Sequence, residues 1–256
     1  MNNLITTVHQ QISQNLHKRT IKFTHNDKTY WIKRPELGEA NIWHKALLLL
    51  SKMFKNPLFI PTVVTDPKKS LANEAKKLSM LSQNNIPVPE LVITDDDFLV
   101  LADSGEPLSV ILNSPDVDFE GKKQITLAMS HSLAQMHNSG FYHSRPALRD
   151  MTYLDGVVYF LDFEEDLEGI LSSDEAIMRD GLIFIHSIYR KLYDDTLADI
   201  AIKVYIATLD KKHKTALFNS VKNFGFLYYL LKISYRFLGK DAIAIYKTLE
   251  FLRSGS

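Results

Sequence analysis

The chain has 256 residues, of which 45% are apolar and 23% charged, so it has enough apolar material for the core of a globular protein. Thirty basic residues balance thirty acidic ones, so the net charge gives no indication of a protein that binds nucleic acid by neutralising phosphates, and we expect no nucleic-acid partner. The sequence has no cysteine, which excludes disulfides, thiolate zinc sites and a cysteine nucleophile.

The N-terminal segment lacks the basic start and the apolar run of a secretion signal. No apolar run approaches the eighteen or more residues of a membrane-spanning helix, so we expect a cytoplasmic protein. Residues 4–18 favour a short amphipathic helix. Residues 20–24 and 29–33 alternate around an Asn-Asp turn as in a β-hairpin, which places Lys33 at the end of a strand.

Residues 40–55 form the next predicted helix, in which lysines surround an apolar face. Such a helix can lie at an anionic membrane surface, which would give the protein a peripheral contact with the inner membrane face. The alternative is a helix packed on the N-terminal part of the molecule. The sequence leaves both interpretations open.

A second helix is predicted at residues 70–83, with Glu74 near its start, and prolines forbid its continuation. Residues 91–94 and 98–102 then indicate two strands around an acidic turn. Asp103-Ser-Gly-Glu-Pro is the first strong chain breaker after these strands. We therefore place a boundary there, between an N-terminal lobe of residues 1–103 and a C-terminal lobe of residues 104–256.

The C-terminal lobe is predicted to be mostly helical. Its expected helices are 122–138, 174–192, 195–209, 213–237 with a break near Gly225, and 241–252. The aromatic residues between 224 and 237 recur at spacings that favour helix core. A strand-rich first part and a helix-rich second part predict an α+β protein.

Two carboxylates flank a predicted hairpin within residues 143–164. The sequence there reads Met-Thr-Tyr-Leu, then Asp-Gly, then Val-Val-Tyr-Phe-Leu, which is typical of a strand, a primed two-residue turn and a second strand. Asp150 precedes the first strand and Asp162 follows the second, so the hairpin brings them side by side. Both could face one divalent cation that bridges nucleotide phosphates.

Lys33, Glu74, Asp150 and Asp162 follow the order strand lysine, helix glutamate, loop aspartate, hairpin aspartate. With Phe-Tyr-His-Ser-Arg-Pro-Ala-Leu-Arg-Asp before the hairpin and Leu-Asp-Phe-Glu-Glu after it, this order resembles the protein-kinase-like superfamily, and within it the small bacterial lipopolysaccharide-kinase and RIO-like group. The resemblance covers roughly residues 33–180. It implies a two-lobed protein-kinase-like fold, with a small strand-rich N-terminal lobe and a helical C-terminal lobe, that uses ATP and magnesium.

The resemblance also implies roles for individual residues. Lys33 would contact the nucleotide phosphates, and Glu74 would pair with it. Leu101 and Asp103 fall in the strand and hinge that would frame the adenine. Asp180 would hold the catalytic loop from beneath.

The catalytic loop can be aligned in two ways, and in both Asp162 would bind the metal. In the first alignment His143 supports the loop, Arg145 stands where the catalytic aspartate is expected, and Asp150 becomes a metal ligand. In the second, Asp150 is the base and Asp155 falls at the metal-binding position. We prefer the first because it preserves the hairpin. Asp150 would then bind metal, accept the acceptor proton or do both, while Arg145 would grip a phosphate or an anionic acceptor.

Three departures from the pattern leave the activity open. Arg145 stands at the position of the usual base, the first hairpin contains no glycine, and Glu164 replaces the glycine expected after Asp162-Phe163. The first hypothesis is an ATP- and magnesium-dependent phosphotransferase for a hydroxyl acceptor, such as an envelope sugar or lipid. The alternatives are a pseudokinase that binds nucleotide or a partner without phosphoryl transfer, and a nucleotidyl transferase. The sequence indicates no oligomeric state.

Overall fold

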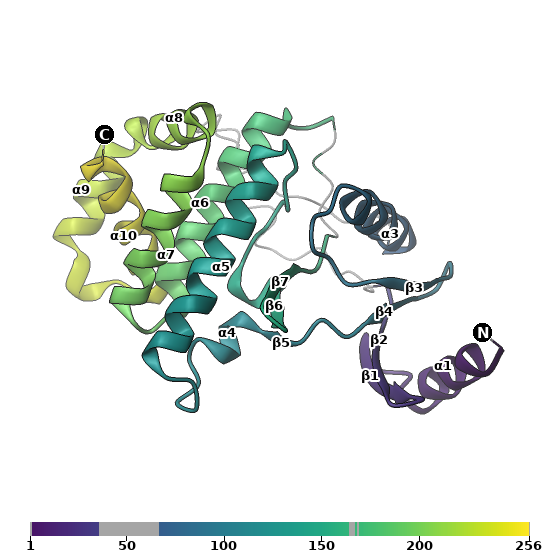
Figure 1. Cartoon of the computed structure of the whole chain (residues 1–256). Coiled ribbons are helices and arrows are strands. Elements are labelled where there is room, and N and C mark those ends of the chain that lie inside the picture. Colours follow the sequence, from purple (N-terminus) through teal and green to yellow (C-terminus); the bar gives the residue numbers. More distant parts are fainter. Residues whose placement is uncertain (1, 36–66, 164–166, 168, 256) are drawn as a thin grey trace.

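The computed structural model describes residues 2–35, 67–163, 167 and 169–255. These residues form an α+β protein with a small antiparallel sheet lobe and a helical lobe (Figure 1). The fold class predicted from the sequence is confirmed at this level. The predicted helix at 40–55, with its membrane interpretation, and Glu164 lie outside the described residues.

The sheet lobe has four antiparallel strands in the order β1-β2-β4-β3. Its elements are α1 (Asn2–Gln14), β1 (Thr20–His25), β2 (Lys28–Lys33), α3 (Pro67–Gln83), β3 (Leu91–Thr94) and β4 (Leu99–Ala102). Both predicted hairpins are confirmed. The first helix ends at Gln14 rather than residue 18, because the Asn15 side chain donates to the Gln11 carbonyl and so competes with further helical turns.

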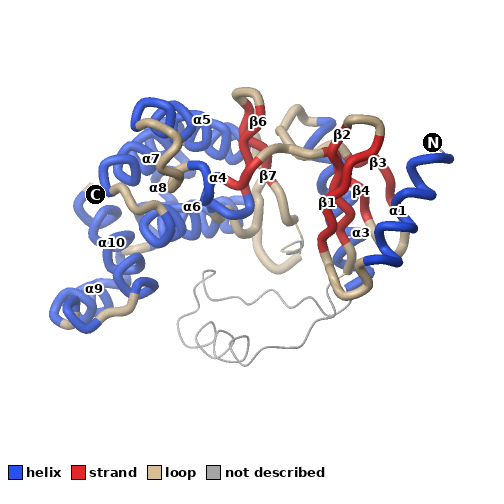
Figure 2. Tube along the Cα trace, turned by 90° about the horizontal axis from the view of Figure 1, so that it is seen from below, coloured by secondary structure: helices blue, strands red, loops and turns tan. Residues whose placement is uncertain are grey.

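One face of this sheet packs against α1, and the other carries residues of the candidate site. Side chains alternate along β2, so Ile32 faces the core beneath α1, whereas Trp31 and Lys33 share the opposite face. In both views α1 and α3 lie on opposite sides of the sheet (Figures 1 and 2). The strand period therefore directs Lys33 toward α3 and the interior of the molecule.

The helices of the helical lobe are α4 (Leu108–Ile111), α5 (Phe119–Asn138), α6 (Ser173–Lys191), α7 (Asp195–Thr208), α8 (Lys211–Ser220), α9 (Gly225–Ile233) and α10 (Lys240–Ser254). The lobe is built around α5, α6 and α7, in which α7 packs against both of the others. The Asp118 side chain caps α5, and Ser172 with Glu175 forms a capping box that starts α6. No helix in the described part of the chain has both the length and the apolar character needed to cross a bilayer.

The break predicted near Gly225 within residues 213–237 is confirmed. The segment is divided into α8, a 3₁₀ turn at Lys222–Phe224, and α9, which ends at Ile233 rather than residue 237; Val221 and Phe224 at the break are buried. The expectation that its aromatic residues belong to the core is wrong for Phe226 and Phe237, which are exposed. α9 is apolar on most of its sides, but of the helices it packs chiefly against α10.

The predicted catalytic hairpin lies between the two lobes in a second, three-stranded sheet. Its strands are β5 (Glu106–Pro107), β6 (Met151–Leu154) and β7 (Val157–Phe160), in that order. Asp155 and Gly156 have φ angles of 49° and 86°, as a type I′ turn requires, so the predicted turn is confirmed. The Leu161 amide donates to the Asp150 carbonyl at 2.8 Å, which holds the two outer ends of the hairpin together.

Candidate functional site

A buried ion pair joins the sheet to α3. Glu74 lies on the same face of α3 as Leu71 and Leu78, three residues before it and four after, so the helical period directs its carboxylate inward. The Lys33 ammonium lies 2.7 Å from Glu74 Oε2 and 2.8 Å from Oε1, and the glutamate side chain is only 1% exposed. The predicted pairing of Lys33 with Glu74 is confirmed.

Asp162 is the second partner of Lys33. Its Oδ1 lies 2.8 Å from the Lys33 ammonium, and its Oδ2 accepts a 2.8 Å hydrogen bond from the Arg145 guanidinium. The backbone of Asp162 is left-handed, with φ of 66°, which is an uncommon conformation outside turns for a residue with a side chain. Burial alone would raise the pKa of this carboxyl, but the charges of Lys33 and Arg145 outweigh it and lower that pKa to about 2.

Asp150 lies at the other end of the hairpin's base and is almost completely buried. Burial raises the pKa of its carboxyl to about 6, although Arg145 and Arg149 act in the opposite direction. Its Oδ1 lies 3.3 Å from the Arg149 Nε. Its Oδ2 is buried and accepts no hydrogen bond within the described part of the chain. The carboxyl of Asp150 therefore has a raised pKa, and one of its oxygens has no hydrogen-bond partner among the described residues.

Arg145 lies between the two carboxylates. Besides its hydrogen bond to Asp162, its Nε is 3.7 Å from Asp150 Oδ2. The two aspartates predicted to face one cation thus both contact the same positive group. The hairpin brings Asp150 and Asp162 to one side, as the sequence predicts, and a protein cation occupies the space between them.

The carboxylates of Asp150 and Asp162 suit magnesium better than a metal ion that requires three or more protein ligands. Among the described residues, no group of three or more His, Asp or Glu side chains is placed to hold a metal ion. Magnesium commonly binds through one or two carboxylates and completes its shell with water and substrate phosphates. The open oxygen of Asp150 and the carboxylate of Asp162 fit that requirement, provided that Arg145 moves aside.

The loop before the hairpin is fixed by Asp180 in α6. Its carboxylate, fully buried, accepts from the backbone amides of His143 at 2.5 Å and Ser144 at 3.0 Å, and lies 3.3 Å from His137 Nε2. Arg179 donates to the Ser144 carbonyl from the same helix turn. The predicted contact of Asp180 beneath this loop is confirmed. Arg179 was not predicted, since nothing in the sequence distinguishes it from a surface arginine.

His143 faces the core rather than solvent. Its ring lies 4.6 Å from that of Phe163, centre to centre, and burial lowers its pKa to about 4, so the imidazole is neutral at physiological pH. Lys77 lies above the same aromatic group, 4.3 Å from the Tyr142 ring centre and 3.1 Å from Ser144 Oγ. The sequence analysis missed Lys77, although its place three residues after Glu74 on α3 puts it beside the pair.

A cavity of about 360 Å³ opens between the four-stranded sheet, α3 and the hairpin. Four predicted charged residues line it, namely Lys33, Glu74, Asp150 and Asp162. Apolar and small residues complete the walls, as is usual for a small-molecule site. These are Trp31, Leu78, Pro89, Leu101, Ala102, Ser104, Gly105, Pro107, Thr152 and Leu161. Two arginines absent from the prediction, Arg19 and Arg149, also line the cavity.

The structure places the remaining predicted residues as follows. Leu101 lines the cavity, whereas the Asp103 side chain accepts a 2.6 Å hydrogen bond from the Trp31 indole and its amide donates to the Thr29 carbonyl. Gly105, in the segment that follows, has a φ of 90°, and a Cβ there would lie 2.0 Å from the Tyr153 carbonyl oxygen. Only glycine therefore lets the chain run this close to β6.

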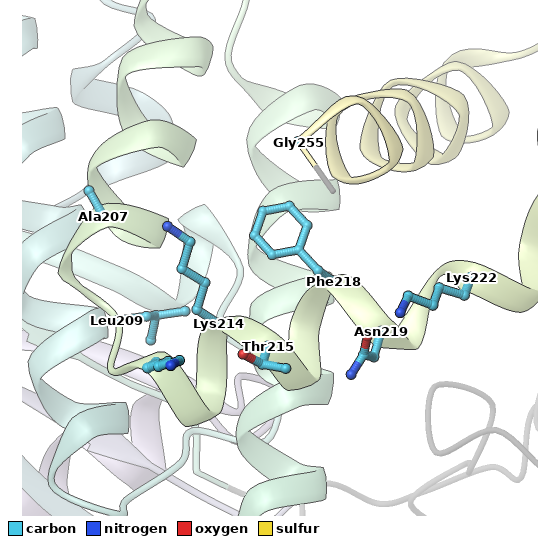
Figure 3. Close-up of a pocket in the computed structure, with 9 residues that line it drawn as sticks. Ala207, Leu209, Lys214, Thr215, Phe218, Asn219, Lys222 and Gly255 are labelled. Atoms are coloured by element: carbon cyan, nitrogen blue, oxygen red, sulfur yellow. The ribbon is translucent and has the colours of Figure 1, made fainter.

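A second hollow of about 610 Å³ lies in the helical lobe, where α8 meets the ends of α7 and α10 (Figure 3). Its polar lining consists of Lys211, Lys214, Lys222, Thr215 and Asn219. These lysines favour anions, but the lining contributes no carboxylate for a metal. The cavity at the hairpin is the smaller one, yet it holds the buried ion pair and the two aspartates, so we take it as the candidate site.

Comparison with known proteins gives a relative but no described activity. No family model matches the chain. The chain is 30% identical over 245 residues, covering 95% of its own length and 93% of the other's, to an uncharacterized protein of Haemophilus influenzae. Identity at this level over nearly the whole of both chains means that the protein belongs to the same family as this Haemophilus influenzae protein.

Proposed function

We propose that the protein is an ATP- and magnesium-dependent phosphotransferase of the protein-kinase-like fold that acts on a hydroxyl acceptor. The observation that supports this most strongly is the position of Lys33, within 2.8 Å of both Glu74 and Asp162 in the wall of the cavity. A strand lysine paired to a helix glutamate and next to a hairpin aspartate is the arrangement expected of that superfamily. Its two-lobed architecture is part of this proposal.

The charged residues have complementary tasks in this proposal. Lys33 would neutralise charge on the nucleotide phosphates, while Glu74 fixes the position of its ammonium group. Asp162 and Asp150 would hold magnesium, which when bound supplies charge neutralisation to the transferring phosphoryl group. The apolar wall with Trp31 and Leu101 offers the flat base a water-poor surface.

The geometry supports the first of the two alignments of the catalytic loop. His143 and the Asp180 contact together hold the loop from within, which is the supporting role that alignment assigns to the histidine. Asp155, required as a metal ligand by the second alignment, lies in the exposed turn at the opposite end of the hairpin from Asp162. With its pKa near 6, Asp150 can accept a proton from a hydroxyl at neutral pH.

The acceptor is part of the proposal only as a chemical class. The resemblance favours an envelope saccharide or lipid, and we place the reaction in the cytoplasm or at the inner membrane face. Arg145 and Arg149, both beside Asp150, would attract an acceptor that carries a phosphate or carboxylate.

A second candidate function is a pseudokinase that binds nucleotide or a partner without phosphoryl transfer. Arg145 favours it, because a guanidinium that contacts both Asp150 and Asp162 competes with a metal for the same oxygens. If Arg145 keeps this position when nucleotide binds, the phosphates meet a protein cation where the first proposal requires magnesium.

A thermal-shift titration with ATP, with and without magnesium, tests the first proposal. A ligand specific to the folded state must raise the melting temperature by mass action. We expect a magnesium-dependent shift in the wild type that Asp162→Asn abolishes. Asp155→Asn is the matched control, because it changes an aspartate of the same hairpin whose φ is also positive, far from the cavity.

The outcomes separate the two functions. A magnesium-dependent shift lost only in Asp162→Asn, together with transfer of the γ-phosphate to an acceptor hydroxyl, supports the phosphotransferase. A shift without turnover, with or without magnesium, supports the pseudokinase. Absence of any shift at millimolar ATP would contradict the phosphotransferase and would leave a pseudokinase that binds a partner instead of nucleotide.

A further inference from the structure

The C-terminal lobe exposes a large apolar surface on α9 and the 3₁₀ turn that follows it at Tyr235–Phe237. Phe226 is 82% exposed, Ile233 86% and Phe237 90%. Leu230 and Tyr229 are also more than half exposed. We call these five residues the α9 face. Single exposed apolar residues are ordinary, but five large ones within twelve positions form a contiguous patch of the kind that marks an interaction surface.

The spacing explains why the four members of the face within α9 share one direction. Positions 226, 229, 230 and 233 follow each other at intervals of three, one and three residues, which is one side of a helix, and Phe237 follows in the 3₁₀ turn beyond it. The opposite side is held by α10, where the Tyr228 ring stacks on that of Tyr246 at 5.5 Å and Leu231 is buried. α9 is therefore fixed to the protein by its inner side, while its outer side is directed into solvent.

The segment that contains the α9 face carries charges of one sign. Between residues 222 and 240 the sequence has no acidic residue, whereas the chain as a whole has as many acidic as basic residues. The basic residues of this segment are Lys222, Lys232, Arg236 and Lys240. Apolar side chains that project from a short helix with lysine, arginine and tyrosine beside them match the surface of an anionic bilayer, which offers acyl chains beneath negative headgroups.

We propose that the α9 face docks on an anionic lipid surface. Nine helical residues extend about 14 Å, roughly half of the bilayer's hydrocarbon thickness, so α9 would lie in the interface rather than cross it. In both views α9 is at the end of the helical lobe farthest from α1 and the four-stranded sheet (Figures 1 and 2). A protruding edge of this kind can enter the headgroup layer without covering the candidate cavity.

This inference goes beyond the proposed function and depends on no property of the cavity. It is tested by sedimentation of the full-length protein with sucrose-loaded vesicles of 70% phosphatidylcholine and 30% phosphatidylglycerol. We expect binding to these vesicles, a loss of at least tenfold on pure phosphatidylcholine, and weaker binding as salt is raised. The salt and lipid comparisons use unmodified protein, so they do not depend on how a variant folds.

Variants then assign the binding to the α9 face. Phe226→Ser, Ile233→Ser and Phe237→Ser combined should reduce binding at least tenfold, because each removes an exposed apolar side chain. The matched control is Leu16→Ser with Tyr193→Ser, which removes two large side chains, 69% and 77% exposed, elsewhere on the surface. Lys232→Gln with Arg236→Gln should weaken binding roughly fivefold for each charge removed.

A fluorescence measurement covers the case in which the triple variant folds poorly. Phe237→Trp places a reporter at the most exposed position, in addition to Trp31 and Trp43, whose emission in the wild type serves as the background. Relative to the wild type, we expect the added emission to shift to the blue with anionic vesicles and to be quenched by brominated acyl chains. Three results would overturn the proposal: no binding of the wild type to anionic vesicles, equal binding of the triple and control variants, or a reporter in Phe237→Trp that brominated chains leave unquenched. Self-association lost in the triple variant, without vesicle binding, would assign the face to a second copy of the chain instead.

Discussion

The carboxylates of Asp180 and Asp162 are both held by hydrogen bonds, but their partners differ. Asp180 is sealed inside the helical lobe, and two of its partners are backbone amides of the loop at His143 and Ser144. Asp162, in contrast, borders a cavity, and its partners are the flexible side chains of Lys33 and Arg145. A carboxylate bound to fixed backbone amides determines the course of the chain. One bound to mobile cations can exchange them for a ligand.

The largest predicted effect concerns the sealed carboxylate. Asp180→Ala leaves two buried amides and His137 without their acceptor, so we expect a loss of about 3 to 5 kcal/mol in the free energy of unfolding. Urea denaturation followed by circular dichroism measures it. Asp199→Ala, in which an exposed pair with Lys203 is removed, should cost less than about 1 kcal/mol. Similar losses in both variants would mean that the Asp180 contacts do not determine the loop.

The second effect is the pH dependence that His143 imposes. Its pKa is about 4 when folded and 6.5 when unfolded. As the pH falls below 6.5 the unfolded chain binds the proton first, so stability is lost down to pH 4, in total about 3 kcal/mol. Asp150 acts oppositely in part of this range, because its raised pKa makes the folded state take up a proton first.

A difference measurement isolates the histidine. His143→Phe keeps an aromatic ring beside Phe163 but cannot be protonated, and the contribution of Asp150 is common to both proteins. Urea denaturation between pH 7.5 and 4 should therefore show the variant gaining about 3 kcal/mol relative to the wild type as the pH falls. A pH-independent difference would mean that the imidazole is not buried in its neutral form.

The third effect concerns Glu74, which we expect to matter more for nucleotide affinity than for the free energy of unfolding. Glu74→Gln removes one charged partner of Lys33 while Asp162 remains, so we expect a smaller loss of about 1 to 2 kcal/mol in unfolding free energy. Nucleotide affinity, measured by calorimetry, should fall at least tenfold because the ammonium is no longer fixed. Glu250→Gln, in a pair with Tyr246 outside the cavity, is the control for affinity. A variant that keeps full nucleotide affinity would contradict the role proposed for Glu74.

The smallest effect on stability is expected for Arg145→Gln. The arginine side chain is partly exposed, so its ion pairs are screened and their loss should cost less than about 1 kcal/mol. Affinity for magnesium or manganese should rise, since Asp150 and Asp162 lose the cation that competes for their oxygens. Arg149→Gln serves as the comparison, because among the two aspartates Arg149 pairs only with Asp150. Weaker metal binding in Arg145→Gln would show that the guanidinium assists rather than competes.

The sequence allowed prediction of those features that follow from local periods. The Asp-Gly turn specifies its own hairpin, and the alternation in residues 29–33 places Lys33 at the end of a strand, whereas the pairing of Lys33 with Glu74 was expected only from the resemblance. These rules act over a few residues, so neighbours far along the chain are not required.

Other features depend on contacts that no local pattern reveals. The Trp31 indole contacts Asp103, which is 72 positions away in the sequence. The Arg145 guanidinium contacts Asp162 because the hairpin brings that aspartate back beside it. The exposure of the α9 face could not be predicted from the sequence for the same reason. An apolar helix face predicts burial only if a neighbour exists to cover it, and the sequence of α9 does not say that its outer side has none within the described chain.

The connection between the lobes has a mechanical consequence. The chain leaves the four-stranded sheet at Asp103 and joins β6 at Glu106, while farther back the Pro87 carbonyl accepts from Phe160 at the end of β7. The sheet lobe is thus connected at two separate places to the three-stranded sheet, so a hinge at either place is restrained by the other. Ligand exchange would then proceed by rotation of side chains such as Arg145, with rates set by rotamer changes rather than by separation of the lobes.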